Sequence, residues 1–514
     1  MPRSGVWGTT TRRRWLVALA TAFTVAAAGC ATTGHKAAPG GGGSSRLGSG
    51  GGPGPAVPLI GGATASGSKG GVSASARGQA ATGSGAGVLG GGPGASSSAG
   101  GAPAAVPGAT PAGGTIQVGF FYPNDGGAAY AAFGVKSQSG TSASLVDAVN
   151  RLTDDINQHG GLGGRKMVLV LHGAPLVTSE TWDAQGQAAC SAFTEDHKVF
   201  AAILEINGTV SVSECLASRH VVVLESRNVV YDRYEYQRTS PYVYSADGLD
   251  LSRQGPWLDE LARGGYFDKG AKLGVITEDD TTHSRSIAEV VRPTLRSHGV
   301  AIADVVALSA PQATADASAM AAQAGNAVLK FKTEGIDHVI FWGTEGVGPF
   351  FFPTAAENQQ YRPRYGISTY DYPELNRRQA PAAQWHRAMG AGWSGAGDVG
   401  MPPNWTPNAL AQKCLKIFSD VGLAPTTGDT ASAELGLCDT LWLLKTGLDR
   451  ASAATPEAFR VAIDGLGTSV VAARGTPISW GPGKYDGAAA VRRFAFDDGC
   501  SCFKWASPTW TPAP

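Results

Sequence analysis

From Thr115 onward, short apolar runs alternate along the chain with stretches long enough to form helices. The first four runs are Thr115 to Phe121, Met167 to Leu171, Val199 to Leu204 and Val221 to Leu224. Continuous rather than alternating apolarity is typical of strands covered on both faces, as in a parallel sheet. Between the first two runs, apolar residues from Leu145 to Ile156 recur at helical spacing. The order of strand, helix, strand and helix predicts an α/β domain.

A second series of the same kind follows. Its predicted strands and helices are Lys272 to Thr277, Ser284 to Ser297, Val300 to Leu308, an Ala-rich helix ending near Thr333, and His338 to Trp342. Two α/β units of this size exceed one ordinary sheet, so we expect two lobes.

The stretch INQHGGLGGRKMVLVL, from Ile156 to Leu171, carries four glycines around one leucine. A phosphate-binding glycine loop follows a strand and precedes a helix, because the anion binds the free N–H groups of the helix N-terminus. Here the predicted helix comes first and the strand second. We therefore interpret Gly160 or Gly161 as a helix cap and Gly163-Gly164 as a turn.

This helix, turn and strand resemble the N-x-x-G-G-[IL]-x-G-[RK] segment of type I periplasmic binding proteins of the branched-chain amino-acid-binding (Leu/Ile/Val-binding-like) kind, which capture solutes for ABC importers. Three further parts of the chain resemble the same family: Thr115 to Gly119 its opening strand, Ala189 to Ile203 its second helix and third strand, and Ile478 to Gly481 with Phe494 to Phe496 its closing hairpin. The resemblance covers about residues 115 to 505.

The resemblance implies two doubly wound parallel-sheet lobes joined by a hinge that the chain crosses three times. We place the crossings near Ser245, Gly397 and Val471. Lobe 1 would then comprise residues 115–244 and 398–470, and lobe 2 residues 245–397 and 471–514.

Composition divides the 514-residue chain further. Gly, Ala, Ser and Pro dominate residues 30–114, which contain no aromatic residue. Such a segment cannot bury enough apolar surface to offset its chain entropy, so we expect a flexible tether. The whole chain has 41 basic and 41 acidic residues, and this balance gives no reason to expect a nucleic-acid partner.

Residues 1–29 are typical of an export signal, because Arg12 to Arg14 precede a short apolar run. The run ends in Ala27-Ala28-Gly29-Cys30, which resembles the lipobox of bacterial lipoproteins, with Ala27 where a larger aliphatic residue is usual. The resemblance predicts lipidation at Cys30 and attachment to the outer face of the cell membrane. Thr11 to Leu16 also resembles a twin-arginine signal, so the export route stays open.

Export favours disulfides among the other six cysteines, which allow 15 pairings. In a sheet of order 2-1-3-4, the helices carrying Cys190 and Cys215 lie on one face, so this pair is feasible. Our other preferred pairs are Cys414 with Cys438, on two helices joined by a turn, and the close neighbours Cys500 and Cys502.

Ligands of open α/β sheets bind beyond the carboxyl ends of the strands. The loops that follow the predicted strands therefore supply the candidates, although Glu225 among them is explained equally well as a solvated or paired surface charge. The predicted ligand-binding residues are Asn124, Asp125, Thr209, Ser226, His283, Thr344, Glu345, Tyr370 and Asp371. By the resemblance, Thr209 and Ser226 would hold an amino acid's carboxylate and ammonium, while Tyr370, Asp371 and Glu345 would close over it.

No catalytic or metal-binding motif accompanies these residues. The sequence lacks G-x-S-x-G and H-E-x-x-H, and its nine histidines are scattered. We therefore predict no enzyme, no cofactor and no metal, but a binding protein for an amino acid or a related amide or urea compound, with ABC permease subunits as partners. A ligand-sensing lipoprotein of the same fold, without a transport role, is the alternative. Co-purification of permease subunits after crosslinking would separate the two.

Overall fold

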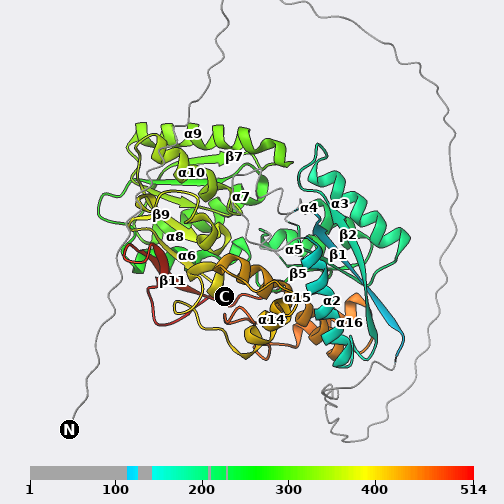
Figure 1. The fold of residues 1–514 in the computed structure, drawn as a ribbon. Coiled ribbons are helices and arrows are strands. Elements are labelled where there is room, and N and C mark those ends of the chain that lie inside the picture. The colour runs from blue at the N-terminus through cyan, green and yellow to red at the C-terminus, as the bar shows by residue number, and fades with distance from the viewer. Residues whose placement is uncertain (1–112, 126–141, 207–209, 227–229, 514) are drawn as a thin grey trace, which may run out of the picture. The chain divides into compact units, whose positions relative to one another are not determined.

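The computed structural model describes residues 113–125, 142–206, 210–226 and 230–513 (Figure 1). Its first lobe is built on a five-stranded sheet of order β2-β1-β3-β4-β5, in which every neighbouring pair is parallel. This order confirms the parallel sheet predicted from the apolar runs and the doubly wound arrangement that the family resemblance implies. The strands are β1 (Thr115–Pro123), β2 (Lys166–Ala174), β3 (Ala201–Leu204), β4 (Val222–Glu225) and β5 (Val243–Ser245), and the helices between them are α2 (Ser142–Gln158), α3 (Trp182–Ser191), the π-helical η1 (Ala192–Asp196), α4 (Val210–Ser218) and α5 (Arg233–Thr239).

The second lobe is built on an eight-stranded sheet in which β12-β11-β10-β9-β8-β6-β7 are successive neighbours and β13 pairs with β11. Strands β6 to β10 pair in parallel, whereas β11, β12 and β13 add antiparallel pairs at one side. The strands are β6 (Leu273–Glu278), β7 (Ile302–Leu308), β8 (His338–Phe341), β9 (Arg364–Ser368), β10 (Met389–Gly392), β11 (Ala490–Asp497), β12 (Cys502–Trp505) and β13 (Thr511–Pro512). The α/β prediction with two parallel-sheet lobes is confirmed.

Several helices cover this second sheet. They are the 3-10 turn η2 (Leu251–Arg253), α6 (Gly255–Arg263), α7 (Thr281–Ser286), the π-helical η3 (Ile287–Val291), α8 (Arg292–Ser297), the 3-10 turn η4 (Thr314–Asp316), α9 (Ala317–Glu334), α10 (Val347–Asn358), the 3-10 turn η5 (Thr369–Asp371), α11 (Pro373–Asn376), α12 (Ala382–Trp385) and α13 (Gly395–Val399). Phe352 on α10 is buried against Phe331 and Tyr365, so it belongs to the core of this lobe.

The chain passes between the two sheets three times. It leaves the first sheet after β5 and returns to pack α14 (Ala409–Ser419), α15 (Gly428–Arg450) and α16 (Pro456–Asp464) beside the first lobe, where α14 and α15 contact α2 (Figure 1). It then runs back into β11. On this last passage Ser245 of β5 pairs with Asp486. The residue limits of the lobes given above stay a prediction.

The glycine cluster forms the cap and turn that the sequence predicts. Gly160, Gly161, Gly163 and Gly164 all have positive φ. The Gly161 N–H donates to Ile156 O at the end of α2, and Leu162 pairs with Arg165 across the turn into β2. The cluster stands at the amino end of β2, on the edge of the first sheet opposite to the carboxyl ends.

One predicted hairpin is wrong. Phe494 to Phe496 lies in β11, but its hairpin partner is β12, where Phe494 opposes Trp505. Ile478 instead makes an isolated bridge with Ala488. The apolar pattern does not mark β12, because its residues, CFKW, form too short an apolar run.

The three preferred cysteine pairs are joined in the structure: Cys190 with Cys215, Cys414 with Cys438, and Cys500 with Cys502. The first bridge ties α3 to α4, which pack against each other as the topology requires. Within the described residues, no helix is long and apolar enough to cross a membrane.

Candidate ligand-binding site

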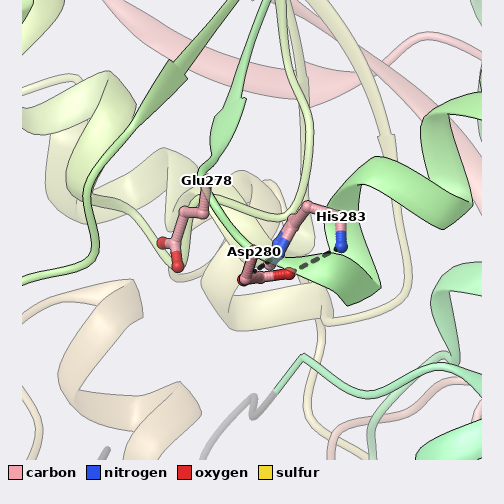
Figure 2. A group of neighbouring side chains, drawn as sticks. All are labelled: Glu278, Asp280 and His283. Atoms are coloured by element: carbon pink, nitrogen blue, oxygen red, sulfur yellow. Dashed lines mark hydrogen bonds and ion pairs between the residues drawn. The ribbon is translucent and has the colours of Figure 1, made fainter.

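The second lobe contributes a cluster of polar groups at the carboxyl ends of β6 and β8. Glu278 is the last residue of β6, and Asp280 caps the N-terminus of α7 by accepting a hydrogen bond from the His283 N–H at 2.8 Å. Figure 2 shows these three side chains close together where β6 leads into α7. The first turn of α7 thus brings His283 back over the end of its own strand.

The imidazole of His283 is held from both sides. Its Nδ1 lies 2.6 Å from Asp280 Oδ2, and its Nε2 lies 2.9 Å from the carbonyl oxygen of Gly343. Burial lowers the pKa of this ring, but the hydrogen bond to Asp280 and the charge of Glu278 outweigh it, so the pKa rises to about 9. In the absence of other ions His283 is therefore an imidazolium at neutral pH.

Gly343 makes this arrangement possible. Its φ is +68°, a conformation that residues with a side chain rarely adopt, and a Cβ at this position would lie 2.5 Å from His283 Nε2. Close to it in the chain, Glu345 also has a positive φ, of 43°. The chain after β8 is thus shaped to place a carbonyl against the imidazole and a carboxylate beside it.

Glu345, in the second lobe, contacts the first lobe. Its Oε1 accepts a hydrogen bond of 3.1 Å from the N–H of Val230, which follows the first lobe's β4. Burial raises the pKa of Glu345, and the negative charges of Glu278 and Glu225 raise it further. Carboxylates of the two lobes are therefore close enough to oppose each other's ionisation.

The first lobe adds acidic and hydroxyl groups at the carboxyl ends of β3 and β4. Glu225 is buried and accepts hydrogen bonds from Ser213 Oγ at 2.5 Å and Tyr231 OH at 3.2 Å. Burial raises its pKa to about 7, so it is not the surface charge considered in the sequence analysis. Ser226 is also buried, and its Oγ donates to Leu204 O and to Glu205.

Further contacts join the lobes around this region. Arg285 Nε on α7 donates to Asp232 Oδ2 at 2.5 Å, and Thr282 Oγ1 donates to Glu235. Arg233 and Glu289 form an exposed ion pair at 2.7 Å. The facing carboxyl edges of the two sheets are therefore in contact in this structure.

The structure brings Ser226, His283, Thr344 and Glu345 to these facing edges. Asp125 instead accepts hydrogen bonds from the N–H groups of Leu176 and Val177, at 2.6 and 2.9 Å. Asn124 is exposed at the end of β1. Thr209 lies outside the described residues.

Tyr370 and Asp371 are buried and carry structural contacts. The Tyr370 hydroxyl donates to Leu249 O at 2.8 Å and accepts from Leu249 N at 3.1 Å. Asp371 Oδ2 accepts from Ser368 N at 2.6 Å, and burial raises the pKa of this carboxyl to about 8. Their role as ligand contacts stays a prediction.

Sequence reasoning missed Glu205 and Glu278. Both stand at the carboxyl end of a strand, Glu205 directly after β3 and Glu278 as the last residue of β6. The apolar run of the latter strand ends at Thr277, and the predicted loop begins only at Asp279. A search that included the final residue of every strand and the residue after it would have found both.

The described structure also holds a cavity of about 600 Å³ at the opposite edge of the second sheet. It is lined by residues at the amino ends of the strands, including Asp268 before β6, His338 at the start of β8, Arg364 at the start of β9 and Arg387 before β10. Asp268 there accepts from Arg387 at 3.0 Å. Because ligands of such sheets bind at the carboxyl ends, we place the candidate site at the lobe contact and not at this cavity.

Neither the known protein-family models nor the curated proteins match this sequence. Solved structures do resemble the chain. A solute-binding protein of an ABC transporter from Rhodopseudomonas palustris BisB5, in complex with 3,4-dihydroxybenzoic acid, has a TM-score of 0.55 and 14% identity over 78% of this chain and 98% of its own. A branched-chain amino-acid ABC transporter protein from Thermus thermophilus with bound valine has a TM-score of 0.54 and 14% identity over 77% of this chain and 96% of its own.

A third structure, periplasmic binding protein type 1 from Bordetella pertussis Tohama I, has a TM-score of 0.53 and 15% identity over 78% of this chain and 100% of its own. Each of these proteins is matched over nearly its whole length. The chain therefore has the type I periplasmic binding protein fold, which it shares with these three binding proteins.

Proposed function

We propose that this chain is an extracytoplasmic solute-binding protein, anchored by a lipid on Cys30, that closes its two lobes around a small polar solute and delivers it to an ABC importer. The proposal places no catalytic step at the site. The observation that carries it is the meeting of the two carboxyl edges at the Val230–Glu345 hydrogen bond, with buried polar groups on both sides. Concave sites between domains, with a few convergent polar groups, are where small ligands bind.

The charge of the site favours a solute with a cationic group. Glu225 comes from the first lobe and Glu278, Asp280 and Glu345 from the second, against the single imidazolium of His283. An ammonium group placed among these carboxylates would relieve their mutual repulsion and receive charge-assisted hydrogen bonds. An amino acid, or an amide or urea compound that carries an amine, fits this requirement.

The other end of such a solute needs hydrogen-bond donors. Ser226 stands directly after β4, but its hydroxyl already donates to Leu204 O and to Glu205. We therefore expect the donors to come from the residues that follow β3, where Thr209 is predicted to act. The hydroxybenzoates bound to two of the similar structures have a carboxylate and no ammonium. We expect the acidic site of this chain to disfavour them.

A thermal-shift screen of the chain without its signal peptide tests the proposal. A ligand that binds only the folded state stabilises it by about 2.7 kcal/mol when its concentration is a hundred times its Kd. We expect a rise in Tm with at least one amino acid or amine-bearing amide or urea, and none with 4-hydroxybenzoate. No shift with any amine compound would contradict the proposal.

A further inference from the structure

The cluster of Glu278, Asp280 and His283 offers a set of metal ligands that no sequence motif marks. One imidazole nitrogen and two carboxylate oxygens from these residues all lie within 4.8 Å of one another. We propose that these three residues bind a divalent transition-metal ion, with Zn²⁺ as the best chemical match, at the carboxyl edge of the second lobe's sheet.

The orientation of His283 suits metal coordination. Its Nε2 faces the carbonyl oxygen of Gly343 at 2.9 Å, and a carbonyl only accepts, so this nitrogen carries the proton. In the neutral ring the lone pair then lies on Nδ1, which points at Asp280. Metal-binding histidines commonly donate their second N–H to a backbone carbonyl in this way, which fixes the ring for coordination.

Glu278 lacks a hydrogen-bond donor among the described residues that would compensate its burial. In the described part of the chain its side chain receives no hydrogen bond, although it is partly buried beside Asp280 and His283. A partly buried carboxylate without a donor is costly unless a cation compensates it. Figure 2 shows Glu278 at the strand end beside the Asp280–His283 pair.

The ligand atoms indicate which metal would bind. A mixed set of one nitrogen and two oxygens suits Zn²⁺ and its neighbours, whereas Ca²⁺ and Mg²⁺ prefer oxygen ligands alone. Three protein ligands leave at least one coordination position for water or for a donor atom of a solute. When the metal binds, it takes the place of the Nδ1 proton, which is released to solvent.

The site uses residues of the second lobe alone, but Glu278 and Asp280 also belong to the acidic group that we propose faces the solute's ammonium. The test is therefore made without solute, and its failure would leave the proposed solute binding standing. The test is a Zn²⁺ titration of the full-length chain without an affinity tag, after treatment with a chelator, followed by calorimetry. We expect one Zn²⁺ per chain, and Glu278→Gln and His283→Gln to weaken its affinity at least tenfold. Co²⁺ in place of Zn²⁺ should give a visible absorption band that His283→Gln removes.

Asp279→Asn is the matched control. Asp279 is exposed on the same loop between Glu278 and Asp280, so its substitution changes the charge equally but removes no ligand. We expect this variant to bind Zn²⁺ as the unaltered chain does. Equal weakening in Asp279→Asn, or no stoichiometric Zn²⁺ binding by the unaltered chain, would overturn the proposal. Glu278→Gln, which preserves size and shape, keeps the test valid if His283→Gln fails to fold.

Discussion

Asp398 shows how a single residue ties stability to pH. Its carboxyl is buried in α13, where Oδ2 accepts hydrogen bonds from Ser394 N at 2.7 Å and Thr369 Oγ1 at 3.2 Å. Oδ1 is buried without a hydrogen-bond partner among the described residues. Burial raises the pKa of this carboxyl from 3.8 to about 8, which means that folding favours its protonated form.

We therefore expect Asp398→Asn to flatten the pH dependence of stability. A folded-state pKa above the unfolded value adds stability that is fully present below about pH 4 and is lost as the pH rises through about 8. The amide cannot ionise, and its oxygen can still accept from Ser394. In urea unfolding at pH 5, 7 and 9, the free energy of unfolding of the variant should rise relative to that of the unaltered chain as the pH rises. Parallel curves for the two would refute this interpretation.

At the scale of elements, the turn between α2 and β2 is fixed by backbone conformation. Gly163 has a φ of +56°, a Cβ there would lie 2.8 Å from Leu448 O, and its N–H donates to Asp449 Oδ1 at 2.9 Å. The turn thus meets the end of α15, where Asp449 lies 286 positions later in the chain. Gly164 has a φ of +77°, and a Cβ there would meet no atom within 4 Å.

These two glycines make a matched pair. Gly164→Ala should lower the free energy of unfolding by about 1–2 kcal/mol, because alanine is strained in the left-handed conformation. Gly163→Ala should cost more, because the added methyl also displaces α15 from the turn. The shift of the denaturation midpoint in urea, compared between the two variants, measures the difference. Equal losses of stability would mean that α15 shifts without energetic cost and that its contact with Gly163 does not stabilise the fold.

The elements that the sequence predicts well are those whose apolar runs are continuous, such as β1 to β4. Strand β10 is Met389–Gly392, with sequence MGAG, and no run of large apolar residues marks it. It is a strand because β9 and β11 bond to it on both sides. Tertiary pairing of this kind leaves no local signal in the chain.

The candidate site was likewise predictable from the sequence only in part. Its location was predictable, because carboxyl ends of parallel strands gather at one edge. The state of each side chain was not, since Tyr370 bonds to Leu249, 121 positions away, and Asp371 caps its own turn. Such contacts depend on how the two lobes fold and not on local spacing.

At the scale of the whole molecule, Glu345 has two roles: it bonds to Val230 of the other lobe, and it belongs to the acidic group of the candidate site. Glu345→Gln should weaken binding of an amine solute at least tenfold, or about 1.4 kcal/mol. Burial raises the pKa of Glu345 to about 8, but a bound ammonium would favour its ionised form, and the amide of the variant cannot supply that charge. The amide oxygen still accepts from Val230, so the contact between lobes is kept. Calorimetric titration with the solute found in the screen measures the change.

Glu289→Gln is the control for this experiment. Glu289 also pairs across the lobes, with Arg233, but both side chains are exposed. Exposed ion pairs contribute little, so the affinity should stay within about twofold. Unchanged affinity in Glu345→Gln would mean that the solute's ammonium lies elsewhere.

The start of β1 and the candidate site lie at opposite edges of the first sheet. Thr115 starts β1 at the amino edge of the first sheet, and Gly113 just before it bonds to Gly164 in the glycine turn. The candidate site lies at the carboxyl edge. The tether proposed for residues 30–114 would therefore join the first lobe at the edge opposite to the candidate site, and its length could vary without blocking access of the proposed solute to that site.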